Sequence, residues 1–351
     1  MNKKTFAVLI GLLTFTVGVA AARLAFPGLW QTPSLPPKSN LQLSNYKLSG
    51  PYVHENLTIF LVHGPDQAKS KLFTPLQEAM ERKLVIVHET SDVNELAIEN
   101  VSSSEEVFVQ AGDIVKGGQQ DRVLAVDLIL PAHSGKIPIA AFCVESSRWQ
   151  QRGGESAANF SMSDRMVATR SLKLAAKQEV SQARVWNEVA KAQEKLSDSV
   201  AKDVRSEVSE SSLQLAMEDE KVKESAAAYV NKLISIVESN DVIGFVFAIN
   251  DKLNSADVYA SNSMFKRFWP RLLQTAAIEA VADRPLREKS EVVSIAAVGE
   301  FFGASEQGDE SLNEVTKRTH IFKLQSEKYL FFETRDMEQN AAWVHRSYIT
   351  K

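Results

Sequence analysis

The sequence predicts an α+β fold, in which largely antiparallel sheets pack against two long helices and a further C-terminal helix. Short alternating apolar runs fill the chain from about residue 41 to 150, and the connections between them are too short for parallel crossovers. Residues 172–238 are low in Gly and Pro and rich in Ala, Glu, Lys and Gln, which favours helix. Strand-like runs return after residue 242, so strands and helices occupy separate blocks of the chain.

Alternation and short apolar runs predict the elements of the first block. Within residues 54–62, alternate residues from Leu57 onward are apolar, as in a half-buried strand. Thr74 and Pro75 are a typical N-cap and first helical residue, so a helix is expected over residues 74–83. The other strands are expected at residues 84–88, 96–100, 107–110, 121–130 and 137–145.

Two long helices are expected over residues 172–196 and 203–238, separated by a polar pair of residues. Their charged faces indicate helices that are packed on one side and solvated on the other, and a coiled-coil dimer is the alternative. A strand is expected at residues 242–249, then a tight turn, a returning strand and a helix that begins at Ser261. The closing strands are expected at residues 291–299, 318–324, 329–334 and 343–349.

The N-terminus carries the features of an export signal. Residues 1–5 are basic, residues 6–22 are apolar or neutral, and Ala20 and Ala22 form a small-x-small pair of the kind that signal peptidase cleaves. An uncleaved anchor is the alternative, because apolar residues recur beyond Arg23. Both interpretations predict an extracytoplasmic protein, in the periplasm or cell envelope, that meets the membrane only through its N-terminus.

The expected organisation follows from these features. Four prolines in residues 27–39 predict an extended tether. The expected segments are a signal peptide or anchor at residues 1–22, a Pro-rich tether at 23–40, the main α+β domain at 41–285, and a β-rich closing segment of that domain at 286–351.

The composition excludes several functional classes. The chain has 40 Lys and Arg against 44 Asp and Glu, a net charge of −4, so it lacks the positive excess that binds nucleic acid. One cysteine excludes an internal disulfide and a thiolate metal cluster. The six histidines show no metal-binding spacing, so the sequence predicts neither a metal nor a cofactor.

Polar groups gather at the end of one predicted strand. Within residues 137–145, Cys143 and Glu145 share a face, and Arg148 and Trp149 follow in the loop. Arginine binds phosphate or carboxylate through two hydrogen bonds, and an indole offers a stacking surface. This strand end is therefore the predicted site for an anionic small molecule.

A glycine-containing hairpin over residues 112–122 is expected to lie beside the strand end. The candidate ligand-binding residues are Lys116, Gln120, Arg122, Arg148 and Trp149. The candidate catalytic residues are Glu145 or Glu89 as a base and Cys143 as a nucleophile.

Each of these residues has a structural alternative. Cys143 lies in an apolar strand and is expected as a buried, inert thiol, while thiol redox chemistry would need a partner thiol. Glu145 and Arg148 can form an ion pair that fixes the loop, and Trp149 can anchor the core.

Three stretches carry a family resemblance: QAGDIVKGGQQDR at 110–122, IPIAAFCVESSRW at 137–149, and IGFVFAINDK from residue 243. Together with neighbouring segments, the chain over about residues 40–285 resembles the domain associated with ADP-ribosylglycohydrolases and rhodanese/phosphatase-superfamily proteins. The resemblance also matches Gln182 and Trp186 to the family pattern. It implies an association with ADP-ribose or phosphoester metabolism and assigns no catalytic role.

Two functions remain open at this stage. The first is binding or hydrolysis of a phosphorylated or nucleotide-like small molecule at the strand end. The second is a non-enzymatic envelope module, whose helices over residues 172–238 bind a protein partner. An open cleft at the strand end favours the first, and a sealed, fully paired network favours the second.

Overall fold

Strands and helices occupy separate blocks of the chain, as the sequence predicts. The computed structural model describes residues 46–67, 73–90, 92–146, 160–166, 169–284 and 292–351. Its strands form sheets of eight, six and three strands. Among the described strand pairs, only β3 (Thr74–Pro75) with β6 (Val107–Val109) is parallel. The α+β class with largely antiparallel sheets is thus confirmed.

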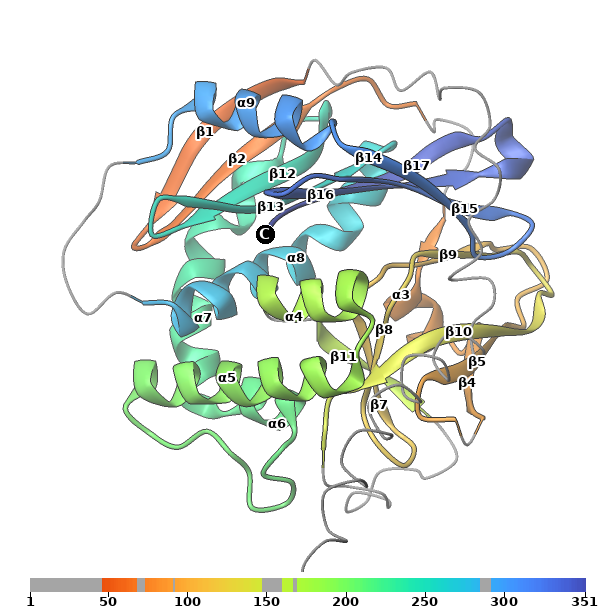
Figure 1. Ribbon diagram of the computed structural model, residues 1–351, viewed down its shortest axis with the longest axis horizontal. Coiled ribbons are helices and arrows are strands. Elements are labelled where there is room, and N and C mark those ends of the chain that lie inside the picture. Colours follow the sequence, from red (N-terminus) through yellow and green to blue (C-terminus); the bar gives the residue numbers. More distant parts are fainter. Residues whose placement is uncertain (1–45, 68–72, 91, 147–159, 167–168, 285–291) are drawn as a thin grey trace, which may run out of the picture.

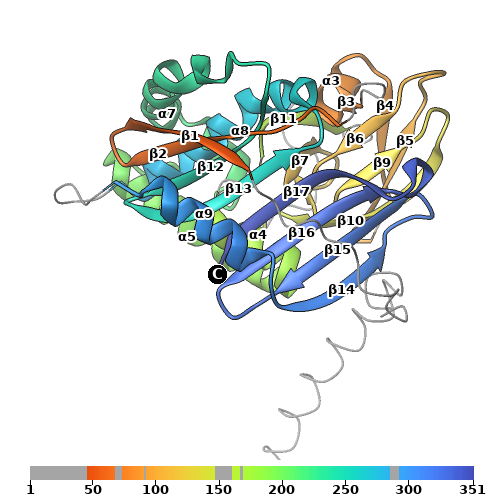
Figure 2. The same cartoon turned by 90° about the horizontal axis from the view of Figure 1, so that it is seen from above.

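The eight-stranded sheet joins early and late parts of the chain (Figures 1 and 2). Its strands, in spatial order, are β1 (Lys47–His54), β2 (Leu57–His63), β12 (Val242–Ile249), β13 (Lys252–Tyr259), β17 (Ala342–Thr350), β16 (Tyr329–Asp336), β15 (Thr319–Gln325) and β14 (Asp309–Glu314). Because β17 lies between β13 and β16, the strands that follow residue 300 continue the sheet begun by β1.

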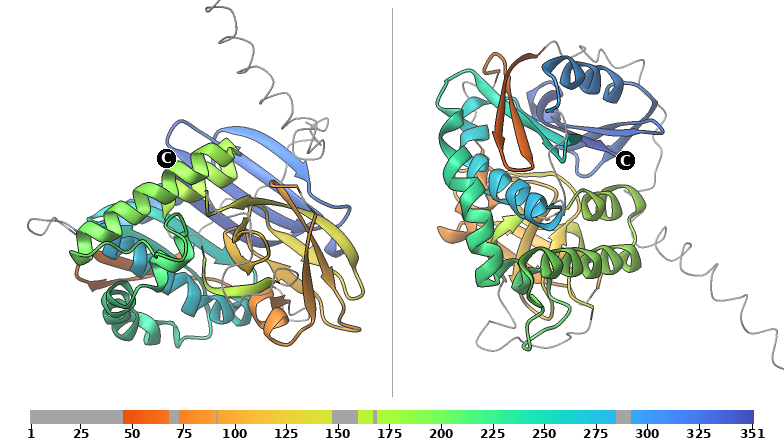
Figure 3. Two further views of the ribbon diagram at one scale, coloured as in Figure 1. Left: turned by 90° about the horizontal axis from the view of Figure 1, so that it is seen from below. Right: turned by 90° about the vertical axis from the view of Figure 1, so that its left-hand side faces the viewer.

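Helices cover both faces of this sheet, so β2 is buried on both faces and not half-buried as predicted, because Phe60 and Val62 on its second face are apolar as well. In β2, Leu57 and Ile59 join the core beneath α8 (Asn262–Ala282), whereas Phe60 joins the core beneath α9 (Ile295–Ser305). The right-hand view of Figure 3 shows α9 and the other helices on opposite sides of the sheet. Full burial of a Phe or Leu side chain contributes about 1.5–3 kcal/mol, so both faces stabilise the fold.

A second lobe holds the two smaller sheets. The six-stranded sheet has the order β11 (Phe160–Met166), β7 (Asp113–Gly117), β8 (Arg122–Leu124), β10 (Gly135–Cys143), β5 (Glu95–Asn100) and β4 (Val85–Glu89). The three-stranded sheet has the order β3, β6 and β9 (Leu128–Leu130), and α3 (Leu76–Glu81) packs beside it. The predicted helix at residues 74–83 begins later than expected, because Thr74 and Pro75 pair with β6.

The first predicted long helix is broken. It consists of α4 (Arg170–Leu174), a π-helical turn at Ala175–Glu179, and α5 (Gln182–Val200). Val180 adopts a left-handed conformation with φ 48°, and the Ser181 side chain then caps α5 by accepting a hydrogen bond from the backbone of Arg184. A serine N-cap starts a new helix, which is why the favourable composition does not give one continuous helix.

The second predicted long helix is shorter than expected. Residues 203–212 are not helical, and the helices are α6 (Leu213–Glu218) and α7 (Glu220–Leu233). Asp203 and Ser206 each accept a hydrogen bond from the backbone N–H two residues further on. Such local bonds compete with helix formation, which composition alone does not reveal.

Two other expectations are corrected. Residues 291–299, expected as a strand, contain the start of α9, whose N-cap Ser294 accepts a hydrogen bond from the backbone of Ala297. Residues 121–130, expected as one strand, form β8 and β9, separated at residues 125–127. The interruption between β8 and β9 places Asp127 between the two lobes.

The described helices include none that is long and apolar enough to cross a membrane. Residues 1–45, which contain the predicted signal or anchor and the tether, lie outside the described residues.

Candidate functional site

The structure gathers five of the predicted site residues at the end of β10. This strand-end group consists of Glu89, Gln120, Arg122, Cys143 and Glu145. Arg122 Nη1 donates to Gln120 Oε1 at 3.0 Å and contacts Cys143 Sγ at 2.5 Å. Arg122 Nη2 lies 3.6 Å from Glu89 Oε2. The hairpin and the strand end therefore meet, as the sequence predicts.

Glu145 closes this group from the other side. Its Oε2 accepts a hydrogen bond of 2.9 Å from the backbone N–H of Asp121, and its carbonyl accepts one of 3.1 Å from Gln120 Nε2. Gln120, Arg122, Cys143 and Glu145 are each at most 1 % exposed. These four side chains are thus buried, and they are held by bonds from Arg122 to Gln120 and Cys143 and by bonds to the backbone at Asp121 and Glu145.

Burial also determines the state of the Cys143 thiol. Desolvation raises the pKa of Cys143 to about 11, although the Arg122 charge opposes this effect. A thiol with this pKa stays protonated near neutral pH, so it is a poor nucleophile. The predicted alternative, a buried and inert thiol, agrees with this environment.

The start of α5 is bound to the same strand end. Gln182 accepts from the backbone N–H of Cys143 and donates to its carbonyl, both at 2.8 Å. Trp186 Nε1 donates to the Glu145 carbonyl at 3.1 Å. Two residues that match the family pattern therefore fix α5 to β10.

The remaining predicted residues contribute less to this group. Lys116 is partly exposed, and its Nζ lies 3.3 Å from Glu218 Oε1 on α6. Arg148 and Trp149 lie outside the described residues. Glu89 keeps some solvent exposure and accepts a hydrogen bond from the backbone N–H of Gln119 at 3.0 Å.

A different set of charged residues lies between the two lobes. His345 Nδ1 is 2.7 Å from Asp127 Oδ2, and His345 Nε2 is 3.1 Å from Asp257 Oδ1. The Tyr259 ring stacks on His345 with a centroid distance of 4.7 Å. All three members of this Asp–His–Asp chain are at most 5 % exposed.

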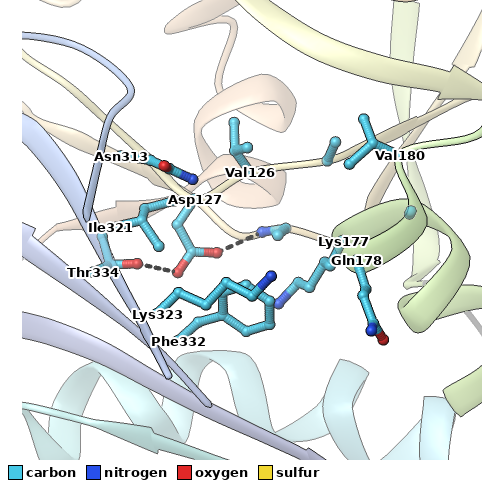
Figure 4. A pocket seen from close by; sticks show the side chains of 13 residues that line it. Val126, Asp127, Lys177, Gln178, Val180, Asn313, Ile321, Lys323, Phe332 and Thr334 are labelled. Atoms are coloured by element: carbon cyan, nitrogen blue, oxygen red, sulfur yellow. Dashed lines mark hydrogen bonds between the residues drawn. The ribbon is translucent and has the colours of Figure 1, made fainter. Parts of the chain in front are cut away.

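Strand pairing explains how these residues meet. Tyr259 on β13 is opposite His345 on β17, and His345 is in turn opposite Thr334 on β16. Opposite residues of antiparallel strands point to the same face, so a polar stripe crosses the sheet towards the second lobe. Asp127 comes from that lobe and accepts hydrogen bonds from Thr334 Oγ1 at 2.6 Å and from the backbone of Ala111 at 2.8 Å (Figure 4).

The three groups hold one another in their charged forms. Burial alone would lower the pKa of His345, but Asp127 and then Asp257 raise it above the ordinary histidine value. Burial alone would raise the pKa of Asp127 and of Asp257, but His345 and nearby lysines lower both pKa values. An imidazolium between two carboxylates is therefore the stable arrangement.

A pocket of about 120 Å³ opens beside Asp127. Its lining combines polar groups with apolar surface: Ala111, Ala125, Val126, Asp127, Ala176, Lys177, Gln178, Val180, Asn313, Ile321, Lys323, Phe332 and Thr334. Lys177 comes from the π-helical turn, and Lys323 lies on β15 opposite Phe332 on β16. The pocket is thus formed by the eight-stranded sheet, the helical turn and the loop that carries Asp127.

Two lysine side chains converge on one aromatic ring in this pocket. The Nζ atoms of Lys177 and Lys323 lie 5.2 and 5.9 Å from the centroid of Phe332. Figure 4 shows both side chains approaching the ring from different elements. Neither ammonium makes a hydrogen bond or ion pair with another described residue. We call Asp127, Lys177, Asp257, Lys323 and His345 the pocket group.

The pocket group has an excess of positive charge. Lys173, which lies over the Phe247 ring and also has no described ion-pair partner, adds a third ammonium next to Asp257. Burial raises the pKa of Glu279, but the Lys173 charge lowers it, so this carboxylate balances the third ammonium. The pocket group itself therefore holds two carboxylates against one imidazolium and two lysines. Burial lowers the pKa of Lys177, while Asp127 and Asp257 act in the opposite direction. An anion in the pocket would relieve this imbalance.

Sequence reasoning missed the pocket group for a topological reason. Asp257 and His345 are 88 residues apart, and Asp127 precedes His345 by 218. One local signal existed, because Asp127 interrupts the apolar run VLAVDLIL at residues 123–130. An acidic residue inside such a run indicates either that the strand is interrupted there or that the carboxylate has a buried polar partner.

The described residues contain no group of three or more His, Cys, Asp or Glu side chains arranged to hold a metal ion. No curated protein and no solved structure matches the chain. One family model does match, over residues 45–349: the ARG and Rhodanese-Phosphatase-superfamily-associated Protein domain. Since this match covers most of the chain, the protein belongs to the ARG and Rhodanese-Phosphatase-superfamily-associated Protein domain family.

Proposed function

We propose that this protein binds a small anionic molecule in the pocket beside Asp127. The observation that carries the proposal is the convergence of Lys177 and Lys323 on Phe332, with no carboxylate among the described residues paired to either. Partly buried ammonium groups are costly without a counter-charge, so a bound anion would stabilise the site.

The chemistry of the lining defines the ligand further. Phe332, Ile321, Val126 and Val180 offer apolar surface, so the ligand carries a short carbon skeleton as well as its charge. A cavity of about 150 Å³ holds a benzene-sized molecule, so this pocket of about 120 Å³ encloses one carboxylate or phosphate with a few carbon atoms. A nucleotide-like ligand, such as ADP-ribose, would extend beyond the pocket mouth.

The test is a thermal-shift screen of the full-length protein against pyruvate, inorganic phosphate, ribose 5-phosphate and ADP-ribose. A ligand at about a hundred times its Kd adds about 2.7 kcal/mol, which raises Tm by several degrees. The pocket variant is Lys323→Met, and the matched control is Lys252→Met, which removes an exposed lysine.

A shift that disappears in Lys323→Met and persists in Lys252→Met supports the proposal. A shift that survives in both variants places the ligand elsewhere. The absence of any shift in the folded wild type overturns the proposal for these four ligands and their chemical classes.

We also propose that the protein is exported or anchored by its N-terminus. The support is the order of basic, apolar and small residues over 1–22 and the proline-rich segment that follows. Cell fractionation and the intact mass of the recovered protein test this. Recovery in the cytoplasm would contradict export, and a mass that includes Met1 would contradict cleavage.

A second candidate function is a non-enzymatic envelope module that binds a protein partner through residues 172–238. The sealed strand-end group favours it, because Arg122, Cys143 and Glu145 are bonded within the core rather than presented to a ligand. A ligand shift that is lost in Glu145→Gln but kept in Lys323→Met would favour a ligand site at the strand end over both candidates.

A further inference from the structure

Lys177 lies at an irregular point of the backbone and not on a regular surface helix. It lies in the π-helical turn Ala175–Glu179, which ends at the left-handed residue Val180. π-helical segments are rare and occur frequently at functional sites. The turn directs Lys177 into the pocket beside Asp127, where its Nζ lies over Phe332.

We propose that Lys177 forms an imine with the carbonyl group of a small 2-oxo acid, whose carboxylate pairs with Lys323. This inference rests on the proposed function and names its substrate class. A 2-oxo acid has an anionic group next to an electrophilic carbon, and the two lysines provide a partner for each.

The surroundings of Lys177 make its ammonium easier to deprotonate to the nucleophilic amine. Burial lowers the pKa of Lys177, the nearby Lys173 ammonium lowers it further, and Asp127 and Asp257 oppose both effects. A lysine that is desolvated near another cation is a recognised way to prepare an amine for Schiff-base chemistry. No described residue makes a hydrogen bond or ion pair with Nζ, so no direct contact holds the amine in its protonated form.

The chemical step balances without an oxidant or reductant. The Nζ lone pair attacks the carbonyl carbon, the carbonyl oxygen is protonated, and a carbinolamine forms. The C–O bond then breaks, and the oxygen leaves as water with the two protons lost from the amine, which gives a neutral imine. A proton taken up from solvent at the pocket mouth converts the imine into the iminium. The Asp127 carboxylate, kept anionic by His345, stabilises the protonated iminium.

The size of the pocket agrees with this ligand class. Pyruvate has as many non-hydrogen atoms as benzene, and benzene fills a cavity slightly larger than this one, about 150 Å³ against about 120 Å³. The methyl group of pyruvate would contact Ile321 or Val180, both of which line the pocket. Longer 2-oxo acids would project from the mouth.

The experiment traps the imine in the full-length protein. The protein is incubated with pyruvate or glyoxylate and reduced with sodium cyanoborohydride, which converts an imine into a stable secondary amine. For pyruvate, the expected adduct adds the mass of pyruvic acid less one oxygen atom, and peptide mapping places it on Lys177. Two variants accompany the wild type: Lys177→Arg, which keeps the charge but cannot form an imine, and Lys252→Arg as the surface control.

The outcomes separate this inference from the proposed function. Modification of Lys177 in wild type and Lys252→Arg, with loss of the adduct in Lys177→Arg, supports the imine. A pyruvate-dependent Tm shift without trapping at Lys177 overturns the imine and leaves anion binding intact. Trapping spread evenly over exposed lysines overturns the imine as well. The absence of both a Tm shift and an adduct overturns both proposals for this ligand class.

Discussion

The strand-end group and the pocket group are both buried and charged, yet they differ in how their charges are satisfied. At the strand end, Arg122 is surrounded by Gln120, Cys143 and Glu89, and Glu145 is bonded to backbone. In the pocket, Lys177 and Lys323 have no such partners among the described residues and face open volume. Burial of charge therefore does not by itself identify a ligand site. The useful sign is unbalanced charge beside a cavity.

The largest effect is expected from His345→Leu, which sharpens this comparison by removing the central cation of the pocket group. Two buried carboxylates, Asp127 and Asp257, would then lose their shared partner, at a cost of about 3–5 kcal/mol in the free energy of unfolding. Urea unfolding measures this cost. The control is His320→Leu, since His320 makes only a 4.0 Å contact with an exposed glutamate. Equal costs for both variants would contradict the assigned role of His345.

A smaller loss is expected from Arg122→Met at the strand end. The change leaves Gln120 Oε1 and the Glu89 carboxylate without their cationic partner, which costs about 2 kcal/mol. Binding of an anion in the pocket should survive. Arg205→Met, at an exposed arginine, is the control for the loss of charge. Loss of ligand binding at unchanged stability would move the functional site to the strand end.

The pH dependence of stability should also distinguish the two groups. The folded-state pKa of His345 is raised, so its contribution is fully present below about pH 6.5, the unfolded value, and is lost as the pH rises through the folded value. Each unit of pKa difference corresponds to about 1.4 kcal/mol. Urea titrations of wild type and His345→Gln across this range measure the effect. A decline of equal slope in both proteins would exclude His345 as its source.

The Asp127 and Asp257 carboxylates should affect the free energy of unfolding at acidic pH. Their folded-state pKa values are lowered, so their contribution is present above about pH 3.9, the unfolded value, and is lost as the pH falls through the folded values. A Thr334→Val variant, which removes one hydrogen bond to Asp127, should unfold at a slightly higher pH in acid titration. An unchanged acid midpoint would show that this bond contributes little.

The smallest change in stability is expected from Lys323→Met. Removal of an ammonium without an ion-pair partner should alter the free energy of unfolding by less than about 1 kcal/mol, while the ligand-dependent Tm shift disappears. Thermal unfolding with and without pyruvate or phosphate measures both quantities. A large loss of stability in the absence of ligand would mean that Lys323 has a structural role instead.

Local sequence patterns predicted much of the framework. The alternation from Leu57, the hairpin glycines at residues 117–118 and the turn before Lys252 all correspond to observed strands and turns. Helix limits were less predictable, because Ser181 and the Asp203–Ser206 turn act through local side-chain bonds that composition does not record. The meeting of Gln120, Arg122, Cys143 and Glu145 followed from one hairpin and one strand.

The pocket group could not be found in the same way. Asp127, Asp257 and His345 come from three distant strands or loops, and their meeting depends on the order of strands in the eight-stranded sheet. The ammonium of Lys177 enters the pocket only because a helix that looked continuous contains a π-helical turn. Tertiary pairing and a local irregularity therefore decide the site, and neither is expressed as a periodic pattern.

The position of β17 has a consequence for how the chain is made. β13 is completed at residue 259, but the strand that covers its edge spans Ala342–Thr350. A chain that emerges in order from a ribosome or a translocation channel must keep this edge, with its unpaired backbone N–H and C=O groups, away from other chains until the last strand arrives. The yield of folded protein is therefore expected to depend on chaperone protection during this interval. Chains that stop before residue 342 should aggregate.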